Sequence, residues 1–98
     1  MKYKERWSPR ASSDFDAIIS YLLKEWTVKE ALNFIDKVER IIALLLKSPK
    51  MFKASNKKRQ IRQCVLHPNV SMYYRITENA IEILAMFDNR QKPSKLKL

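Results

Sequence analysis

Apolar residues follow two different periods along the chain, one in each half. In residues 15–45 they recur every three or four positions, the spacing that places side chains on one face of an α-helix. In residues 60–87 they alternate with polar residues, which is the period of a strand with one buried face. The pattern therefore predicts helices in the first half and strands in the second.

The first helix is indicated by an apolar stripe that ends at a tryptophan. Its members are Phe15, Ile18, Ile19, Leu22, Leu23 and Trp26. Ser13 precedes the stripe and Asp16 follows within the first turn, a combination that satisfies free N–H groups at a helix start and suits the helix dipole. We therefore expect the N-cap of this helix at Ser13.

The second helix is expected to begin directly afterwards. Thr27 and Glu30 have the spacing of a capping box, and Ser48-Pro49 marks the end of the helix. The apolar stripe between them comprises Ala31, Phe34, Ile35, Val38, Ile41, Ile42 and Leu45. The short connection makes the two helices a hairpin, whose apolar faces require a surface to cover.

That surface is predicted by three successive strands. They are Gln60–Leu66, Val70–Thr77 and Ile81–Phe87, separated by turns at His67-Pro68-Asn69 and Glu78-Asn79. Short turns between alternating segments indicate an antiparallel meander, and Tyr3–Trp7 is a further short strand. We expect an α+β fold in which the helical hairpin packs on one face of a small, mostly antiparallel sheet.

Strict alternation assigns the strand residues to two faces. The face beneath the helices is expected to carry Met72, Tyr74, Ile76, Ile81, Ile83, Ala85 and Phe87. The opposite face is expected to carry Arg62, Ser71, Tyr73, Arg75, Thr77, Leu84 and Met86. We expect the function to depend on this second face, which the helices leave uncovered and which carries two arginines.

Length and charge limit the class of protein. The 98 residues suit one domain, residues 1–98, with residues 94–98 as a fraying tail. Twenty basic and ten acidic residues give a net charge of +10, which favours polyanionic partners such as nucleic acid, the ribosome or an acidic protein. Basic residues are concentrated in the loop before the first meander strand, namely Lys53, Lys57, Lys58 and Arg59.

Several classes of site and location are disfavoured. The longest apolar run, Ile41–Leu46, is too short for a bilayer span, and no secretory signal begins the chain. Cys64 is the single cysteine and His67 the single histidine, so an ordinary zinc site is not possible. The absence of glycine excludes phosphate-binding loops of the P-loop kind. We expect a cytoplasmic protein without a cofactor, metal or membrane partner.

A set of residues in order along the chain carries a family resemblance. The first half contributes Trp7-Ser8-Pro9-Arg10-Ala11, Asp14, Ile18, Tyr21, Trp26, Ala31, Phe34 and Pro49. The second contributes Arg62, Tyr73-Tyr74-Arg75-Ile76, Ile81-Glu82-Ile83-Leu84 and Arg90. With the predicted element order, the chain resembles the RelE/ParE superfamily of bacterial type II toxins, and its first half resembles the ParE branch.

The resemblance implies a toxin that a co-expressed, usually acidic antitoxin neutralises by wrapping an extended segment around it. The sheet face opposite the helices, with Tyr73, Leu84 and Met86, is our expected surface for such a segment. The alternative is that Leu84 and Met86 lie beneath the chain's own tail, Ser94–Leu98.

The two branches of the superfamily have different targets. RelE-like toxins are ribosome-dependent endonucleases that cleave mRNA without metal, and ParE-like toxins inhibit DNA gyrase by binding. RelE-like enzymes use lysines, arginines and a C-terminal tyrosine. In this sequence Arg62 occupies the position of one such lysine and Arg90 that of one arginine. However, Cys64 and Ser71 occupy positions where basic residues are expected, and no tyrosine follows Tyr74.

The resemblance therefore favours a ParE-like toxin that binds gyrase through Arg62, Tyr73, Arg75, Leu84, Met86 and Arg90, or presents these residues to its antitoxin. The alternative is a metal-independent mRNA endonuclease. For such an enzyme the candidate catalytic residues are Arg62, Arg75 and Arg90 as phosphate ligands, with His67 or Asp88 as the base.

Overall fold

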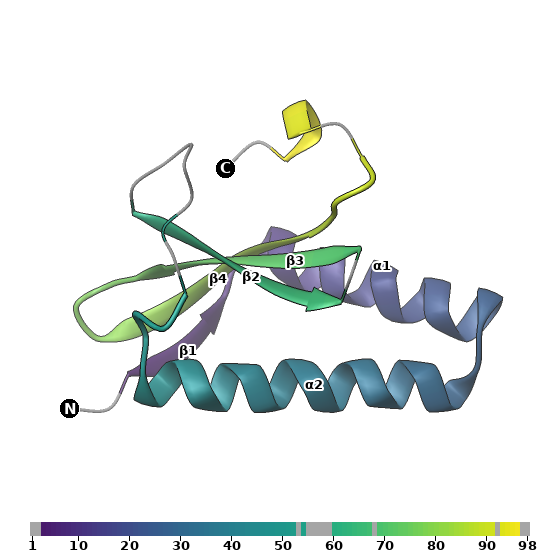
Figure 1. The fold of residues 1–98 in the computed structure, drawn as a ribbon, viewed down its shortest axis with the longest axis horizontal. Helices are drawn as coiled ribbons and strands as arrows, with labels where there is room; N and C mark the ends of the chain where they lie inside the picture. Colours follow the sequence, from purple (N-terminus) through teal and green to yellow (C-terminus); the bar gives the residue numbers. More distant parts are fainter. Residues whose placement is uncertain (1–2, 53, 55–59, 68, 92, 97–98) are drawn as a thin grey trace.

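The computed structural model describes residues 3–52, 54, 60–67, 69–91 and 93–96. Its elements are β1 (Lys4–Trp7), α1 (Pro9–Glu25), α2 (Val28–Lys47), β2 (Ile61–His67), β3 (Val70–Ile76), β4 (Ala80–Asp88) and a 3-10 turn, η1 (Pro93–Lys95). The strands form one sheet in the order β1-β4-β3-β2, in which β1 runs parallel to β4 and the other pairs are antiparallel (Figure 1). The predicted α+β fold is confirmed.

Both helices begin at an N-cap whose hydroxyl oxygen accepts a hydrogen bond from the N–H three residues further on. The Oγ of Ser8 accepts a hydrogen bond from the N–H of Ala11 at 2.9 Å, and Pro9 occupies the first helical position, where its missing N–H costs nothing. The expected start at Ser13 is therefore wrong, and α1 follows β1 almost directly. The expected cap of α2 is confirmed, because Thr27 Oγ1 accepts from the N–H of Glu30 at 3.1 Å.

Both helices pack against the same face of the sheet and enclose the main core (Figure 1). Its buried members are Ala11, Phe34, Val38, Ile42, Leu45, Cys64, Leu66, Met72, Tyr74, Ile81, Ile83 and Met86. Tyr74 is completely buried, and its hydroxyl donates to the carbonyl of Pro49 at 2.9 Å. This bond satisfies the buried hydroxyl and holds the chain where α2 ends.

A β-bulge interrupts the alternation in β4. Tyr73 pairs with Ala85 and Tyr74 pairs with Ile83, so Leu84 is an extra residue opposite β3. Beyond this point the two faces exchange: Met86 lies in the main core, whereas Phe87 lies on the opposite face with Tyr73. The expected positions of Met86 and Phe87 are thus both wrong, because alternation assumes a strand without an inserted residue.

The bulge lies where β1 ends and where side chains at the start of α1 bond to the backbone of β4. Ser8 Oγ donates to the carbonyl of Leu84 at 2.8 Å, and the N–H of Met86 donates to Asp14 Oδ2 at 3.0 Å. These two side chains satisfy backbone groups that β1 is too short to reach. Residues at the start of α1 therefore support the bulge.

The face opposite the helices has a smaller cluster of its own. Ile61, Tyr73 and Phe87 are buried there, with Leu84 and Leu96 packed against them. The side chain of Arg10 donates to the carbonyl of Leu96, and η1 lies on the side of the sheet away from α2 (Figure 1). Leu84 and the tail residue Leu96 therefore pack against the same cluster, whereas Met86 lies in the main core, so the alternative expectation that Met86 lies beneath the tail is wrong. Among the residues described, no helix combines the length and apolar character needed for a bilayer span.

Candidate functional site

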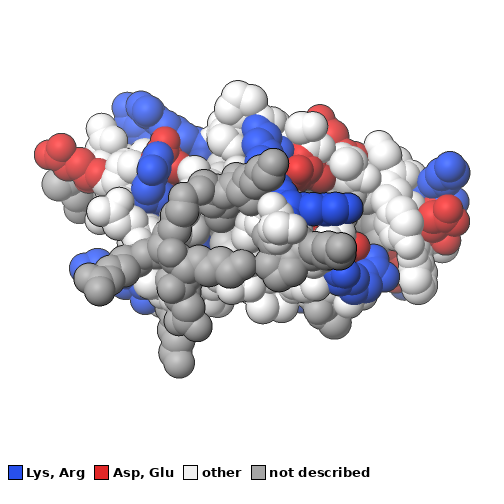
Figure 2. All heavy atoms as spheres, turned by 90° about the horizontal axis from the view of Figure 1, so that it is seen from above, with Lys and Arg blue, Asp and Glu red and all other residues white. Residues whose placement is uncertain are grey.

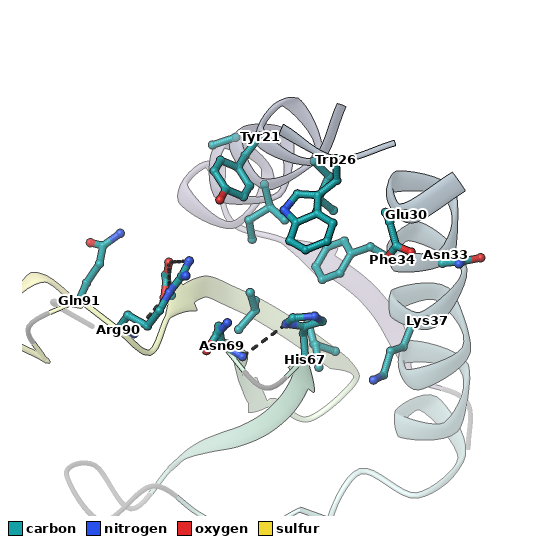
Figure 3. Close-up of a pocket in the computed structure, with 16 residues that line it drawn as sticks. Tyr21, Trp26, Glu30, Asn33, Phe34, Lys37, His67, Asn69, Arg90 and Gln91 are labelled. Carbon is teal, nitrogen blue, oxygen red and sulfur yellow. Dashed lines mark hydrogen bonds and ion pairs between the residues drawn. The ribbon is translucent and has the colours of Figure 1, made fainter. Parts of the chain in front are cut away.

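A cavity of about 520 Å³ lies between the helical hairpin and one end of the sheet (Figure 3). Its apolar lining consists of Ala17, Ile18, Leu22, Phe34, Leu66 and Val70. Its other lining residues are Tyr21, Trp26, Glu30, Asn33, Lys37, His67, Asn69, Asp88, Arg90 and Gln91. An apolar interior with a polar and aromatic margin is typical of a site for a ligand or a partner side chain.

Two exposed aromatic residues of α1 and its C-cap line this pocket. Tyr21 is 49% exposed and Trp26 is 63% exposed. Figure 3 shows the Trp26 ring near Phe34, with His67 on the facing side of the pocket. Trp26 belongs to the apolar stripe predicted for the first helix, but it is the C-cap that follows the last residue of α1, and its side chain is not buried. Sequence periodicity does not reveal where the covered surface stops.

Three predicted candidates, His67, Asp88 and Arg90, are brought together around this pocket. Arg90 donates from Nε to Asp88 Oδ1 at 3.0 Å and from Nη2 to Oδ2 at 2.8 Å. These bonds lower the pKa of Asp88 and raise the pKa of Arg90. His67 Nδ1 accepts from the N–H of Asn69 at 3.4 Å within the β2–β3 turn. The ionised, Arg90-bonded Asp88 carboxylate is consequently a weak base.

The other two candidate arginines lie elsewhere, on opposite faces of the sheet. Arg62 stands across from Tyr74 on the helix side and donates from Nη1 to the carbonyl of Phe52 at 2.7 Å. Arg75 stands across from Glu82 on the other side and contacts its Oε1 through Nη2 at 2.8 Å. The expectation that Arg62 and Arg75 share a face is wrong, because the β2–β3 register places Arg62 opposite a core residue.

The described basic side chains that are visible on the face opposite α2 do not form a single patch (Figure 2). Figure 2, the view onto that side, shows Lys and Arg side chains at several separate places, with acidic side chains beside some of them. The basic loop residues Lys53, Lys57, Lys58 and Arg59 lie outside the described part of the chain. Within the described part, no group of His, Cys, Asp and Glu side chains is placed to hold a metal ion.

Comparison with known families identifies the fold. A family described as the ParE toxin of the type II toxin–antitoxin system, parDE, matches residues 6–93. The chain belongs to the ParE toxin family. The search of curated proteins found no match.

Solved structures share the fold of this ParE-family chain. A chain of the chromosomal ParDE system from P. aeruginosa has 18% identity and a TM-score of 0.74, covering 89% of this chain and 96% of that one. The E. coli DinJ-YafQ toxin–antitoxin complex has a chain with 11% identity and a TM-score of 0.63, covering 92% and 96%. The YoeB dimer from Staphylococcus aureus follows with 14% identity and 0.63, covering 89% and 97%.

In this ParE-family chain, two positions where RelE-like enzymes are expected to carry basic residues lie inside the protein. Cys64 is fully buried, and desolvation raises the pKa of its thiol to about 11, so it is neutral at pH 7. Ser71 is also fully buried, and its Oγ accepts from Gln63 Nε2 at 3.0 Å. Burial likewise raises the pKa of Tyr73. These groups supply neither a cation nor an accessible base.

Proposed function

We propose that this chain is the toxin of a type II toxin–antitoxin module that binds and inhibits DNA gyrase in the cytoplasm. A cognate, acidic antitoxin neutralises it. Membership of the ParE toxin family supports the proposal, and so does the net charge of +10, which attracts an acidic partner. No cofactor is part of this mechanism.

The observation that carries a binding mechanism is the dispersal of the candidate catalytic residues. Metal-free RNA cleavage requires a base, an acid and cationic donors within hydrogen-bond reach of one phosphate. Arg62 and Arg75 lie on opposite faces of the sheet, and each is bonded to a neighbouring group of the protein. They cannot act on one phosphate together with Arg90 unless the sheet is rebuilt.

One observation favours the second candidate, a ribosome-dependent mRNA endonuclease. His67, Asp88 and Arg90 line the same pocket, where an imidazole base and a guanidinium could flank a phosphate. However, the guanidinium of Arg90 and the carboxylate of Asp88 are already engaged in a bidentate bond with each other. We therefore rank the nuclease below the gyrase inhibitor.

Two assays on the purified toxin separate the candidates. DNA supercoiling by gyrase is measured with increasing toxin, and mRNA ends are mapped in a cell-free translation reaction. We expect supercoiling to fall while the mRNA stays intact, and added antitoxin to restore it. Codon-phased cuts that disappear in the His67→Gln variant, with gyrase unaffected, would reverse the ranking.

A further inference from the structure

We propose that the pocket between Trp26 and His67 binds a nucleotide, with the base stacked between the two rings and the phosphate held by Lys37. This binding site goes beyond the proposed function, which assigns no ligand to the pocket. The pocket's size, its facing rings and the cation on its margin all favour this class of ligand.

The pocket has the volume and lining of a small-molecule site. Its volume of about 520 Å³ lies within the range of about 300–1,000 Å³ that is typical of ligand sites. Leu22, Phe34 and Leu66 contribute to its apolar lining, and Leu66 is fully buried. A flat, partly apolar ring system can therefore enter the pocket and be removed from water.

Two aromatic rings on facing sides of the pocket suit a planar ligand. The large ring of Trp26 is exposed, and Figure 3 shows His67 across the pocket from it. The N–H of Asn69 donates to His67 Nδ1 at 3.4 Å, which helps to orient the imidazole ring. Nucleobases stack on tryptophan and histidine rings because every base has a flat π face. The facing rings thus favour a heteroaromatic ligand over an aliphatic one.

Polar side chains in the pocket lining match the edge of a base. The lining includes the side chains of Glu30 and Asn69. The Glu30 carboxylate can accept from an exocyclic amino group, and the Asn69 amide can both donate and accept. These groups give the pocket a means to distinguish a base from an apolar ring of the same size.

Lys37 is the cation on the pocket margin that can meet a phosphate. Within the part of the chain that the structure describes it makes no hydrogen bond or ion pair, whereas Arg90 donates from Nε and Nη2 to Asp88. Burial raises the pKa of the Cys64 thiol and the charge of Lys37 partly offsets this effect, so the ammonium lies close to β2. Figure 3 shows the Lys37 side chain extending from α2 towards the side where His67 lies. Because the chain has no glycine for a phosphate-binding loop, a side-chain cation must hold the phosphate.

The first test titrates the purified protein with adenosine monophosphate while tryptophan fluorescence is measured. A base stacked on Trp26 should quench the emission in a saturable way. Trp7 should respond little, because it is half-buried with its ring 5.4 Å from that of Phe15. In calorimetric titrations Trp26→Ala should weaken binding on the order of tenfold. The control is Leu44→Ala, since Leu44 is an exposed apolar residue of α2 outside the pocket, and this variant should bind as wild type does.

A second test separates the base from the phosphate by comparing adenosine monophosphate with adenosine. Lys37→Met should weaken binding of the monophosphate by about tenfold and leave binding of adenosine unchanged. Lys47→Met removes the same charge near the other end of α2, outside the pocket, and should change neither. Thermal unfolding of each variant checks that the fold is retained.

A short single-stranded oligoadenylate shows where the nucleotide comes from. An affinity per nucleotide no higher than that of the monophosphate indicates a free nucleotide, and tighter binding that Trp26→Ala abolishes indicates a nucleotide within a strand. The proposal is overturned if millimolar monophosphate gives no saturable quenching, if Trp26→Ala binds as tightly as wild type, or if Lys37→Met and Lys47→Met are equally weakened. Gyrase is absent from these titrations, so their outcome is independent of the proposed function.

Discussion

The two faces of the sheet are built from the same strands but are covered in different ways. Among the described residues, two amphipathic helices enclose a core of twelve buried residues on one face, whereas the cluster on the other face has three buried members, against which Leu96 of the tail packs. The first face therefore holds the fold together, and the second depends on a short segment near the chain end. Because the faces exchange residues at the Leu84 bulge, stability measurements can tell which residue belongs to which face.

The largest expected difference is between the neighbours Met86 and Leu84. Met86→Ala removes a side chain that is 3% exposed in the main core, and we expect it to lower the free energy of unfolding by about 3 kcal/mol. Leu84→Ala, on the half-covered face, should cost about 1 kcal/mol. Urea unfolding followed by circular dichroism measures both. Equal costs would mean that the bulge is absent and the alternation unbroken.

Alkaline pH should weaken the helix-covered face through Cys64. Its pKa rises from 9.0 to about 11 on folding, so as pH increases the thiol ionises first in the unfolded chain. The stabilisation is complete below about pH 9 and is lost as pH rises through about 11. Between about pH 8 and pH 10.5 we expect wild type to lose about 2 kcal/mol more than Cys64→Ala does. Parallel losses in the two proteins, measured by urea unfolding, would contradict a buried thiol.

Arg62 and Arg75 provide a smaller contrast between the faces. Arg62→Met removes a charged donor from the carbonyl of Phe52 and should cost about 1 kcal/mol. Arg75→Met breaks a pair with Glu82 in which the arginine side chain is 44% exposed, and it should cost less than about 0.5 kcal/mol. Thermal denaturation of the two variants measures both costs. A larger cost for Arg75→Met than for Arg62→Met would contradict the conclusion that the helix-covered face contributes more to stability.

The smallest effect is expected at the exposed Arg90–Asp88 pair. Arg90 lowers the pKa of Asp88, so the pair contributes above the ordinary carboxyl pKa and is lost as pH falls through the lowered value. Asp88→Asn should therefore lower the denaturation midpoint slightly at neutral pH and not at all in strong acid. A difference from wild type that grows towards low pH would show that the sign of this coupling is wrong.

Most of the fold can be predicted from the spacing of apolar residues, because each helix and strand has a clear apolar period. The strands and α2 were predicted within one or two residues, and Thr27 was correctly identified as a cap. The start of α1 was missed because the side chain of Ser13 is as suitable for capping as that of Ser8. Ser8-Pro9 was the available signal, since proline is favoured at the first helical position.

The candidate site was predicted less well, because it depends on register and on where surfaces end. A single inserted residue in β4 moved Met86 into the core, and the β2–β3 register separated Arg62 from Arg75. Neither is encoded in a local pattern, since the bulge has no glycine to mark it. The exposed ring of Trp26 was missed for a related reason: apolar spacing continues past the last residue that the sheet covers.

The parallel pairing of β1 with β4 has a consequence for how the protein is made. The first strand to leave the ribosome, Lys4–Trp7, pairs with Ala80–Ile83 near the other end of the chain. Its partner is among the last segments synthesised, so the sheet closes only when translation is nearly complete. A nascent chain interrupted before residue 80 has no finished sheet, and a prematurely terminated product should be inert towards any target that recognises the folded protein.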